Sequence, residues 1–335
     1  MTWEPVVELA RDAVTERSCK ALHGLLDGQG PPPSDGEALP LLWHWMAFLP
    51  LVAQRDLGVD GHPKLGGFLP PLEGTRRMFA GARFKLHRAI HVGEVLDRRS
   101  VVTSVQKKSG RSGELTFVEV THEISIAGHL ALTEVQDIVY RNAETMSTDR
   151  LHGDGAEPAM AGLPSTGQGA PSDPGPAATP AEMKRASSEP AYSAPSDPGS
   201  SVSSGSDPKE LVDKDWEWSS GLDVSPTMLF RFSALTYNAH RIHYDRDYAT
   251  KVEGYPGLVV HGPLQAVALA ELCRAHVPGR SLDSFTFRAR RPAFDSGPLR
   301  LMGRLTASGQ VELAAFDAQG SATMTATGEL LGATR

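Results

Sequence analysis

The sequence has few cysteines and lacks the common motifs of nucleotide-binding, metal-binding and serine-hydrolase proteins. Cys19 and Cys273 are the only cysteines among 335 residues. They are too far apart in the chain to indicate a clustered metal site or a disulfide scaffold, so we expect buried thiols in a reducing cytoplasm. The chain also contains no Walker loop, dinucleotide-binding glycine pattern, Gly-x-Ser-x-Gly elbow or His-Glu-x-x-His sequence. We therefore predict neither a bound metal nor a separate cofactor.

Long hydrophobic runs and blocks of basic residues are missing as well. The most apolar stretch, 258–273, is interrupted by polar residues and is too short to span a bilayer. Residues 1–19 mix charged with apolar side chains, which predicts an amphipathic helix rather than a signal peptide. The net charge is −7, and no basic patch suggests a nucleic-acid partner. These features predict a cytoplasmic protein with no membrane and no nucleic-acid partner.

The composition divides the chain into two domains and a linker. Residues 147–208 are rich in Ser, Pro, Gly and Ala, and the sequence Pro-Ser-Asp-Pro-Gly occurs twice within them. Such a segment has too little apolar surface to offset the entropy lost on ordering, so we predict a disordered linker. The remaining segments, 1–146 and 209–335, are each long enough to form one domain.

The pattern of apolar residues predicts an α+β fold in both segments. In the second segment, Pro263 suits the first turn of a helix that extends to about residue 276, before a series of strands. The first segment has a similar series of strands after the apolar stretch 39–53, which we expect to be helical or irregular. The sequences at 84–89 and 285–290 are alike, which suggests two copies of one fold. The predicted strands are 83–90, 96–106, 115–126 and 130–140 in the first segment, and 284–290, 299–307, 311–316 and 322–330 in the second.

Residues suited to proton transfer are concentrated at two places in the second segment. Two histidines, an asparagine and a carboxylate lie between Asn238 and Asp245, and His261-Gly262-Pro263 follows them. Imidazole can accept and donate protons near neutral pH. A glycine at a helix start lets a carbonyl oxygen approach the backbone N–H groups there, whose partial positive charge stabilises an enolate. The combination is suited to moving a proton beside a polarised carbonyl.

The sequence from Thr236 to Asp245, followed by His261-Gly262, resembles the signature of the MaoC-like, (R)-specific enoyl-CoA hydratase family. Within that family it is similar to the sub-branch that contains 3-methylfumaryl-CoA (mesaconyl-CoA) hydratase. The resemblance implies a double hot-dog fold, with two antiparallel sheets, each wrapped on a central helix, packed as a pseudo-dimer within one chain. It also implies that the first domain is dehydratase-like and shapes the pocket, while the second carries the catalytic motif.

The family pattern assigns roles to four residues of the motif. His243 corresponds to the family's histidine and would remove a proton from the attacking water; its alternative is a bond to a backbone carbonyl at a helix end. Asn238 stands where the family has an aspartate, and an amide can orient water but cannot take its proton; otherwise it is a helix cap or an Asx turn. His240 and Asp245 are the nearby candidates for a second proton-transfer group, although Asp245 also suits a helix cap or an orienting partner for a histidine.

Other residues are predicted to hold the substrate. The resemblance places Gly262 at the oxyanion-binding start of the central helix, and His261 would contact the ligand or simply pack. Period 2 puts Arg288 and Arg290 on one face of a strand, where they could bind coenzyme A phosphates. The alternative for both arginines is a solvated sheet face.

The first segment has no Asn/Asp-x-x-x-x-His motif at the corresponding place, so we expect it to contribute pocket walls. The loop 66–71 could shape the acyl pocket, and Trp43 and Trp45 could line it. Core packing is the alternative for both tryptophans.

The resemblance predicts reversible hydration or dehydration of an enoyl-CoA, with coenzyme A as part of the substrate. The expected acyl group is branched or dicarboxylic, as in 3-methylfumaryl-CoA. The alternatives are a 3-hydroxyacyl-thioester dehydratase of fatty-acid or polyketide type and a non-catalytic hot dog that binds acyl thioesters, which Asn238 keeps open. The candidate assembly is a homodimer of double hot dogs.

Overall fold

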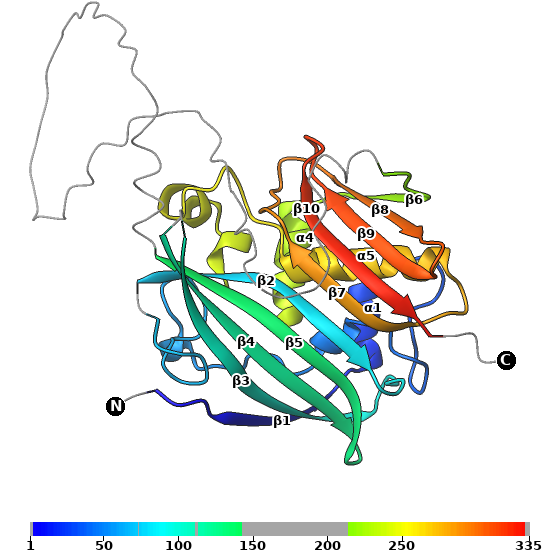
Figure 1. The fold of residues 1–335 in the computed structure, drawn as a ribbon, viewed down its shortest axis with the longest axis horizontal. Coiled ribbons are helices and arrows are strands. Elements are labelled where there is room, and N and C mark those ends of the chain that lie inside the picture. The colour runs from blue at the N-terminus through cyan, green and yellow to red at the C-terminus, as the bar shows by residue number, and fades with distance from the viewer. Residues whose placement is uncertain (1–2, 73, 111–112, 143–213, 332–335) are drawn as a thin grey trace, which may run out of the picture.

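The computed structural model of the protein describes residues 3–72, 74–110, 113–142 and 214–331 (Figure 1). The predicted linker, 147–208, lies outside these ranges. The first half contains β1 (Val7–Ala13), α1 (Glu16–Leu25), β2 (Thr75–Leu86), β3 (Val95–Gly110), β4 (Gly113–Ile126) and β5 (His129–Asn142). The second half contains β6 (Trp218–Leu222), α4 (Pro226–Thr236), α5 (Gly262–His276), β7 (Leu282–Ala289), β8 (Leu299–Leu305), β9 (Gln310–Phe316) and β10 (Ala322–Leu330).

The strands form one antiparallel sheet in which the second half repeats the topology of the first in reverse order. The order across the sheet is β1-β3-β4-β5-β2-β7-β10-β9-β8-β6, so each half has its first strand at the outer edge and its second strand at the centre. The halves join where β2 pairs with β7, as Figure 1 shows, and Phe84 lies opposite Phe285 at this junction. These phenylalanines come from the two sequences predicted to be equivalent. The topology confirms that prediction.

The long helix α5 lies against the sheet of the second half, as its apolar sequence predicts. It begins at Gly262, has Pro263 in its first turn and ends at His276. Residues 264–270 are all buried, because β6, β8, β9 and β10 pack against one side of the helix and other segments enclose the rest. A helix that is apolar all round is stable only in such a core. The strand β10 has the predicted bounds, and β7, β8 and β9 differ from theirs by one or two residues at their ends.

The first half has no helix of comparable length between its first two strands in the part of the chain that the structure describes. The helix α1 follows β1 as α4 follows β6, so α1 corresponds to α4, and the two pack together. Between α1 and β2 there are only short 3-10 turns, at Trp43–Met46 and Gln54–Asp56. Prolines recur throughout this interval, at positions 31–33, 40, 50, 63, 70 and 71, and prevent a long helix. The central helix of the double hot dog therefore belongs to the second half.

The predicted amphipathic helix at 1–19 is wrong for most of its length, because Val7–Ala13 forms the edge strand β1. This strand pairs with β3, and Arg11 forms an ion pair with its cross-strand partner Asp97 (2.6 Å). Helix α1 starts only after Thr15, whose Oγ1 accepts a hydrogen bond from the backbone N–H of the third residue beyond it. A mostly exposed edge strand lacks the alternating apolar pattern by which strands are usually predicted. Its mixture of charged and apolar residues was therefore mistaken for the pattern of an amphipathic helix.

Cys19 and Cys273 are buried and unpaired, as predicted from their spacing. Burial raises the pKa of each thiol to about 11, which makes both poor nucleophiles. In the described residues, no helix is both long enough and apolar enough to cross a membrane.

Candidate active site

The predicted motif forms a tight turn that leaves helix α4. The helix ends at Thr236 and is capped by Tyr237, which has a left-handed backbone conformation (φ 52°). Asn238 then donates its backbone N–H to Ser233 O (2.8 Å) and accepts the backbone N–H of His240 with its Oδ1 (3.0 Å). This is the Asx turn that we considered as an alternative role for Asn238. Its carbonyl oxygen is engaged locally, whereas its amide Nδ2 has no hydrogen-bond partner among the described residues and can meet a ligand.

The side chain of His243 is buried, and a single hydrogen bond fixes its orientation. Its Nδ1 lies 2.7 Å from Val259 O, and because a carbonyl can only accept, Nδ1 carries the proton. Nε2 is therefore the nitrogen with a lone pair. Burial lowers the pKa of His243 to about 4, so the ring is neutral near pH 7. The bond to a backbone carbonyl that we considered as an alternative role for His243 is therefore present. It also fixes the Nδ1–H tautomer, which leaves Nε2 free to act as a general base.

His261 lies directly behind His243 at the start of helix α5. The two rings are stacked, with centroids 3.7 Å apart and planes inclined by 20°. His261 is fully buried, and its Nε2 lies 2.9 Å from the hydroxyl of Ser233. Gly262 follows it, and a Cβ built there would come no closer than 3.6 Å to the nearest atom, Phe79 Cδ1. Packing within the protein does not require glycine here, which leaves room for a ligand oxygen near the first turn of α5.

His240 connects the motif to a loop of the first half that the sequence did not identify. The ring of His62 lies over that of His240, with centroids 3.9 Å apart, and His240 meets His243 edge-on at 5.3 Å. His62 in turn is held by Asp60, whose Oδ2 lies 2.9 Å from its Nδ1. The structure thus joins four histidine rings in a row across the two halves. The sequence around this loop offered only an Asp-Gly-His turn, a weak signal.

Asp60, His62 and His240 also offer ligand atoms that all lie within 4.8 Å of one another. Such a set could hold a divalent metal. However, the Asp60 carboxylate is already engaged by both the ring and the backbone N–H of His62 (2.9 and 3.0 Å). The absence of a metal, predicted from the sequence, stays a prediction.

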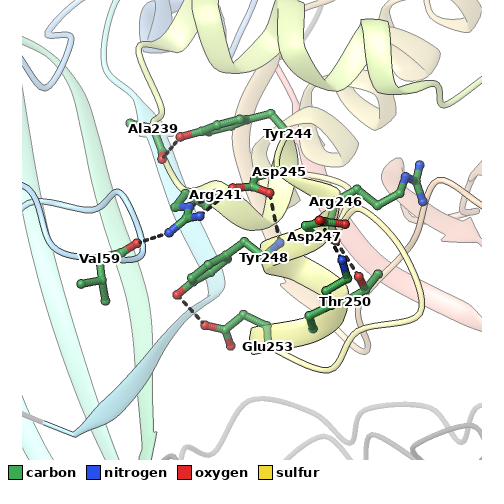
Figure 2. A network of polar contacts seen from close by, with 11 residues as sticks. Val59, Ala239, Arg241, Tyr244, Asp245, Arg246, Asp247, Tyr248, Thr250 and Glu253 are labelled. Atoms are coloured by element: carbon green, nitrogen blue, oxygen red, sulfur yellow. Dashed lines mark hydrogen bonds and ion pairs between the residues drawn. The ribbon is translucent and has the colours of Figure 1, made fainter. Parts of the chain in front are cut away.

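Asp245 belongs to a network that stabilises the turn after the motif (Figure 2). Its Oδ1 accepts the backbone N–H of Tyr248 (3.0 Å), and its Oδ2 forms an ion pair with Arg241 (2.7 Å). Arg241 also donates from Nη1 to Val59 O of the first half (3.0 Å), as Figure 2 shows. Asp245 is therefore a cap, which is one of the three roles considered for it.

Arg288 lies near the end of β7 and Arg290 just after it, on the face opposite to the buried side chains of Phe285 and Phe287. Arg290 donates from Nε to Thr325 Oγ1 (3.0 Å), and burial lowers the pKa of its guanidinium. The pair shares one face, as period 2 requires. Their predicted contact with coenzyme A phosphates stays a prediction.

Both tryptophans predicted as possible pocket residues pack in the core. Trp43 is buried and donates its Nε1–H to Glu271 of α5 (3.0 Å), and Trp45 packs edge-on against Phe84 (5.7 Å). The loop 66–71 contributes apolar side chains that pack on the first half of the sheet, and Pro71 lines a small cavity there. None of the motif residues lines this cavity, so the predicted role of the loop in shaping the acyl pocket stays a prediction.

The row of four histidines, of which His243 and His261 are buried and the other two partly buried, predicts that the protein loses stability as the pH falls below about 6.5. Burial lowers the folded-state pKa of His62, His240, His243 and His261. Below an unfolded-state pKa of about 6.5, the unfolded chain binds protons that the folded chain does not, so each histidine costs about 1.4 kcal/mol per pH unit. For His243 the window extends down to about pH 4. Urea unfolding between pH 8 and 5 measures the slope.

The matched variant for this titration is His243→Gln, which keeps a polar side chain without an ionisable ring. Its free energy of unfolding should decline less steeply with falling pH than that of the wild type, by up to about 1.4 kcal/mol per pH unit. Equal slopes in the two proteins would show that His243 is not held neutral by the fold.

Comparisons with known proteins agree on one family. The family described as hydroxyacyl-thioester dehydratase type 2 matches residues 42–160 and 189–295. The chain is 38% identical over 332 residues to mesaconyl-C(4)-CoA hydratase of Chloroflexus aurantiacus, covering 99% of this chain and 98% of that protein. It is also 46% identical over 79 residues to the mitochondrial hydroxyacyl-thioester dehydratase type 2 of Schizosaccharomyces pombe, covering 23% of this chain and 26% of that one.

Solved structures support the fold. HtdX of Mycobacterium tuberculosis matches with a TM-score of 0.59 at 15% identity, covering 97% of this chain and all of the other. A MaoC-like dehydratase from Phytophthora capsici matches with a TM-score of 0.58 at 13% identity, covering 99% of this chain and 98% of the other. These similarities confirm the double hot-dog fold predicted from the motif.

Proposed function

This chain belongs to the hydroxyacyl-thioester dehydratase type 2 family of MaoC-like hydro-lyases, and on that premise we propose that it reversibly hydrates a branched or dicarboxylic enoyl-CoA such as 3-methylfumaryl-CoA. The observation that carries the proposal is the buried His243, whose Nδ1–H is fixed on Val259 O and whose Nε2 is available beside the start of α5. The full-length similarity to a mesaconyl-C(4)-CoA hydratase supports the choice of acyl group.

In the proposed reaction, His243 Nε2 removes a proton from water as the oxygen adds to the β-carbon. The Val259 carbonyl stabilises the imidazolium that forms, because it already accepts the Nδ1–H. The thioester oxygen gains negative charge as the double bond shifts. Backbone N–H groups in the first turn of α5, where Gly262 leaves room, would stabilise that charge. Coenzyme A phosphates would contact Arg288 and Arg290.

Asn238 would hold the attacking water through its amide nitrogen, because its carbonyl oxygen is used by the backbone N–H of His240. An amide in this role donates a hydrogen bond to the water oxygen and stays neutral. In this proposal, Oδ1 of Asn238 forms the Asx turn and Nδ2 holds the water.

This division of roles predicts different results for two Asn238 variants. Asn238→Asp keeps the acceptor for His240 N–H and should retain stability, whereas Asn238→Leu should lose about 0.5 to 2 kcal/mol and lower kcat by far more than it raises KM. Thermal melts beside steady-state kinetics measure both effects. If Asn238→Leu melts at a lower temperature than the wild type but has normal turnover while folded, Asn238 stabilises the turn and does not position water.

A second candidate function is dehydration of 3-hydroxyacyl thioesters of fatty-acid type. It is favoured by the family description and by the shorter match to the Schizosaccharomyces pombe dehydratase. Both functions use the same chemistry in opposite directions, so substrate preference rather than mechanism separates them. The acyl carrier is the second variable, since either coenzyme A or an acyl carrier protein can present the thioester.

The test incubates the full chain with a panel of enoyl-CoAs in water enriched in ¹⁸O. The panel contains 3-methylfumaryl-CoA, a straight-chain dicarboxylic enoyl-CoA, crotonyl-CoA and a long-chain enoyl-CoA. We expect the label at the β-carbon to appear fastest with 3-methylfumaryl-CoA, as followed by mass spectrometry. Preference for the long-chain thioester would favour the dehydratase alternative, and no labelling of any thioester would favour a non-catalytic binding protein.

A further inference from the structure

The first half contributes a carboxylate–histidine pair to the site, although it lacks the motif. His62 donates its Nδ1–H to Asp60 Oδ2 (2.9 Å), and its backbone N–H meets Asp60 Oδ1 (3.0 Å). The carboxylate therefore fixes both the rotamer and the tautomer of the ring. Because Nδ1 faces Asp60, Nε2 is the nitrogen of His62 that is available to other groups.

Backbone contacts hold this pair against the motif of the second half. The backbone N–H of Arg241 donates to Asp60 O (2.9 Å). At Gly61, which lies between the two members of the pair, φ is 88° and a Cβ would lie only 1.8 Å from Ala239 O. Only glycine allows this approach, because any side chain would push the two loops apart. The pair is therefore positioned by rigid contact and not by side-chain packing alone.

The position of His62 relative to the proposed base is set by His240. His62 and His240 are in ring contact at 3.9 Å, and His240 meets His243 at 5.3 Å. The ring of His240 thus separates two imidazoles that differ in their partners. His62 has a carboxylate, whereas the only hydrogen-bond partner of His243 among the described residues is a backbone carbonyl. A single proton shared by the row is more stable on His62 than on His243.

We propose that His62 is the second proton-transfer group of the site and that Asp60 is its positioning residue, taking over the function that an aspartate at position 238 would have had. The proposal rests on the hydratase function described above. During hydration, His243 Nε2 takes a proton from water while the O–Cβ bond forms, and the π electrons of the double bond move toward the thioester. The protonated His62 then gives its Nε2 proton to Cα and becomes neutral. Exchange of one proton each with water returns His243 and His62 to their starting states, so that one water is added in total.

The charges around His62 determine how its proton titrates. The groups that face it are Asp60 in its own loop, Arg77 on β2, and His240 and His243 from the second half. Burial lowers the pKa of His62, Asp60 opposes this shift, and Arg77 adds to it. Removal of the Asp60 charge should therefore lower the pKa further. Hydration requires the protonated ring, so its rate should fall as the pH rises through that pKa.

The experiment compares His62→Ala, His62→Gln and Asp60→Asn with Asp56→Asn, a variant of an exposed carboxylate in the same loop region. Each protein is assayed for hydration of whichever thioester the wild type turns over fastest, between pH 4.5 and 8, because the lowered pKa of His62 places its alkaline limb below about 6.5. Both His62 variants should lose about 10²-fold in kcat with little change in KM. Asp60→Asn should move the alkaline limb of kcat/KM to lower pH by about one unit. Asp56→Asn should match the wild type.

Several outcomes would overturn the assignment. A folded His62→Gln protein with wild-type kcat, or an alkaline limb that Asp60→Asn does not move, would remove the pair from the chemistry. Loss of wild-type activity in a chelator, restored by Zn²⁺, would instead make Asp60, His62 and His240 metal ligands. A wild type that hydrates no thioester would overturn the proposed function as well, whereas an active wild type with unaffected variants would overturn only the role of His62.

Discussion

The His243→Ala variant is expected to lose about 10² to 10⁴-fold in kcat while keeping its fold. The mutation removes the imidazole whose Nε2 is proposed to take the proton from water, and no other described side chain donates to Val259 O. It leaves that buried carbonyl without a partner and removes the ring that stacks on His261, which should cost about 1 to 3 kcal/mol of stability. Steady-state kinetics and urea unfolding measured on the same preparation separate the two effects.

His276→Ala is the matched control for this variant. His276 also donates its Nδ1–H to a backbone carbonyl, that of Leu272 (2.9 Å), and also stacks on an aromatic ring, that of Trp218 (5.3 Å). It lies at the opposite end of α5 from the motif. His276 is exposed, whereas His243 is buried, so His276→Ala should lose less stability than His243→Ala and should keep its turnover. Equal losses of turnover would mean that the effect of His243→Ala comes from weakened packing of α5.

The parts of the fold that could be predicted from the sequence are those in which local pattern and burial agree. Helix α5 combines Pro263 in its first turn with a continuous apolar interior, and the central strands have alternating or wholly apolar faces. The strands β1 and β6 were missed because they are short, exposed edge strands. Strand β2 begins at Thr75 rather than at residue 83, because its first residues are only half-buried and contain two arginines.

The candidate site could be predicted only where its residues are close in the sequence. His243, Asn238 and Gly262 follow one motif; the structure places Asn238 on the turn after α4, Gly262 at the start of α5, and His243 against His261 beside that start. Asp60 and His62 could not be predicted, because they reach the motif through contacts between distant segments. The feature that holds both residues beside the motif is the close approach of Gly61 to Ala239 O. This contact can be recognised only in the three-dimensional structure.

In the site that we propose, the two halves of the fold contribute different parts. The second half keeps the central helix and the histidine whose tautomer is fixed by a carbonyl. The first half lacks a helix of that length in its described residues, and its irregular segment is free to reach across and place Asp60 beside the motif. The prolines that prevent a second central helix thus also leave an irregular loop, which is the one proposed to contribute Asp60 and His62.

The Glu134→Ala variant is expected to lose about 3 to 5 kcal/mol of stability, which is the largest effect that we predict on folding. Glu134 on β5 is only 2% exposed, and its Oε2 lies 3.0 Å from Nε2 of the equally buried His44. Its Oε1 accepts hydrogen bonds from Trp45 Nε1 (3.0 Å) and Gln136 Nε2 (2.7 Å). Burial alone would raise the pKa of Glu134, but the bond to His44 and the other donors lower it to about 2. Truncation would leave one buried donor, on His44, and two partly buried donors, on Trp45 and Gln136, without their acceptor.

The control is Asp97→Asn, which breaks an ion pair of similar length (2.6 Å to Arg11) at the exposed edge of the same half of the sheet. Surface pairs of this kind contribute little because water and salt screen them, so this variant should unfold at nearly the same urea concentration as the wild type. Glu134→Gln should fall between the two, since its carbonyl can replace one acceptor but its amide cannot accept from His44. If Glu134→Ala unfolds together with Asp97→Asn, water must enter and satisfy the exposed donors, and the cluster around Glu134 would then not stabilise the first half.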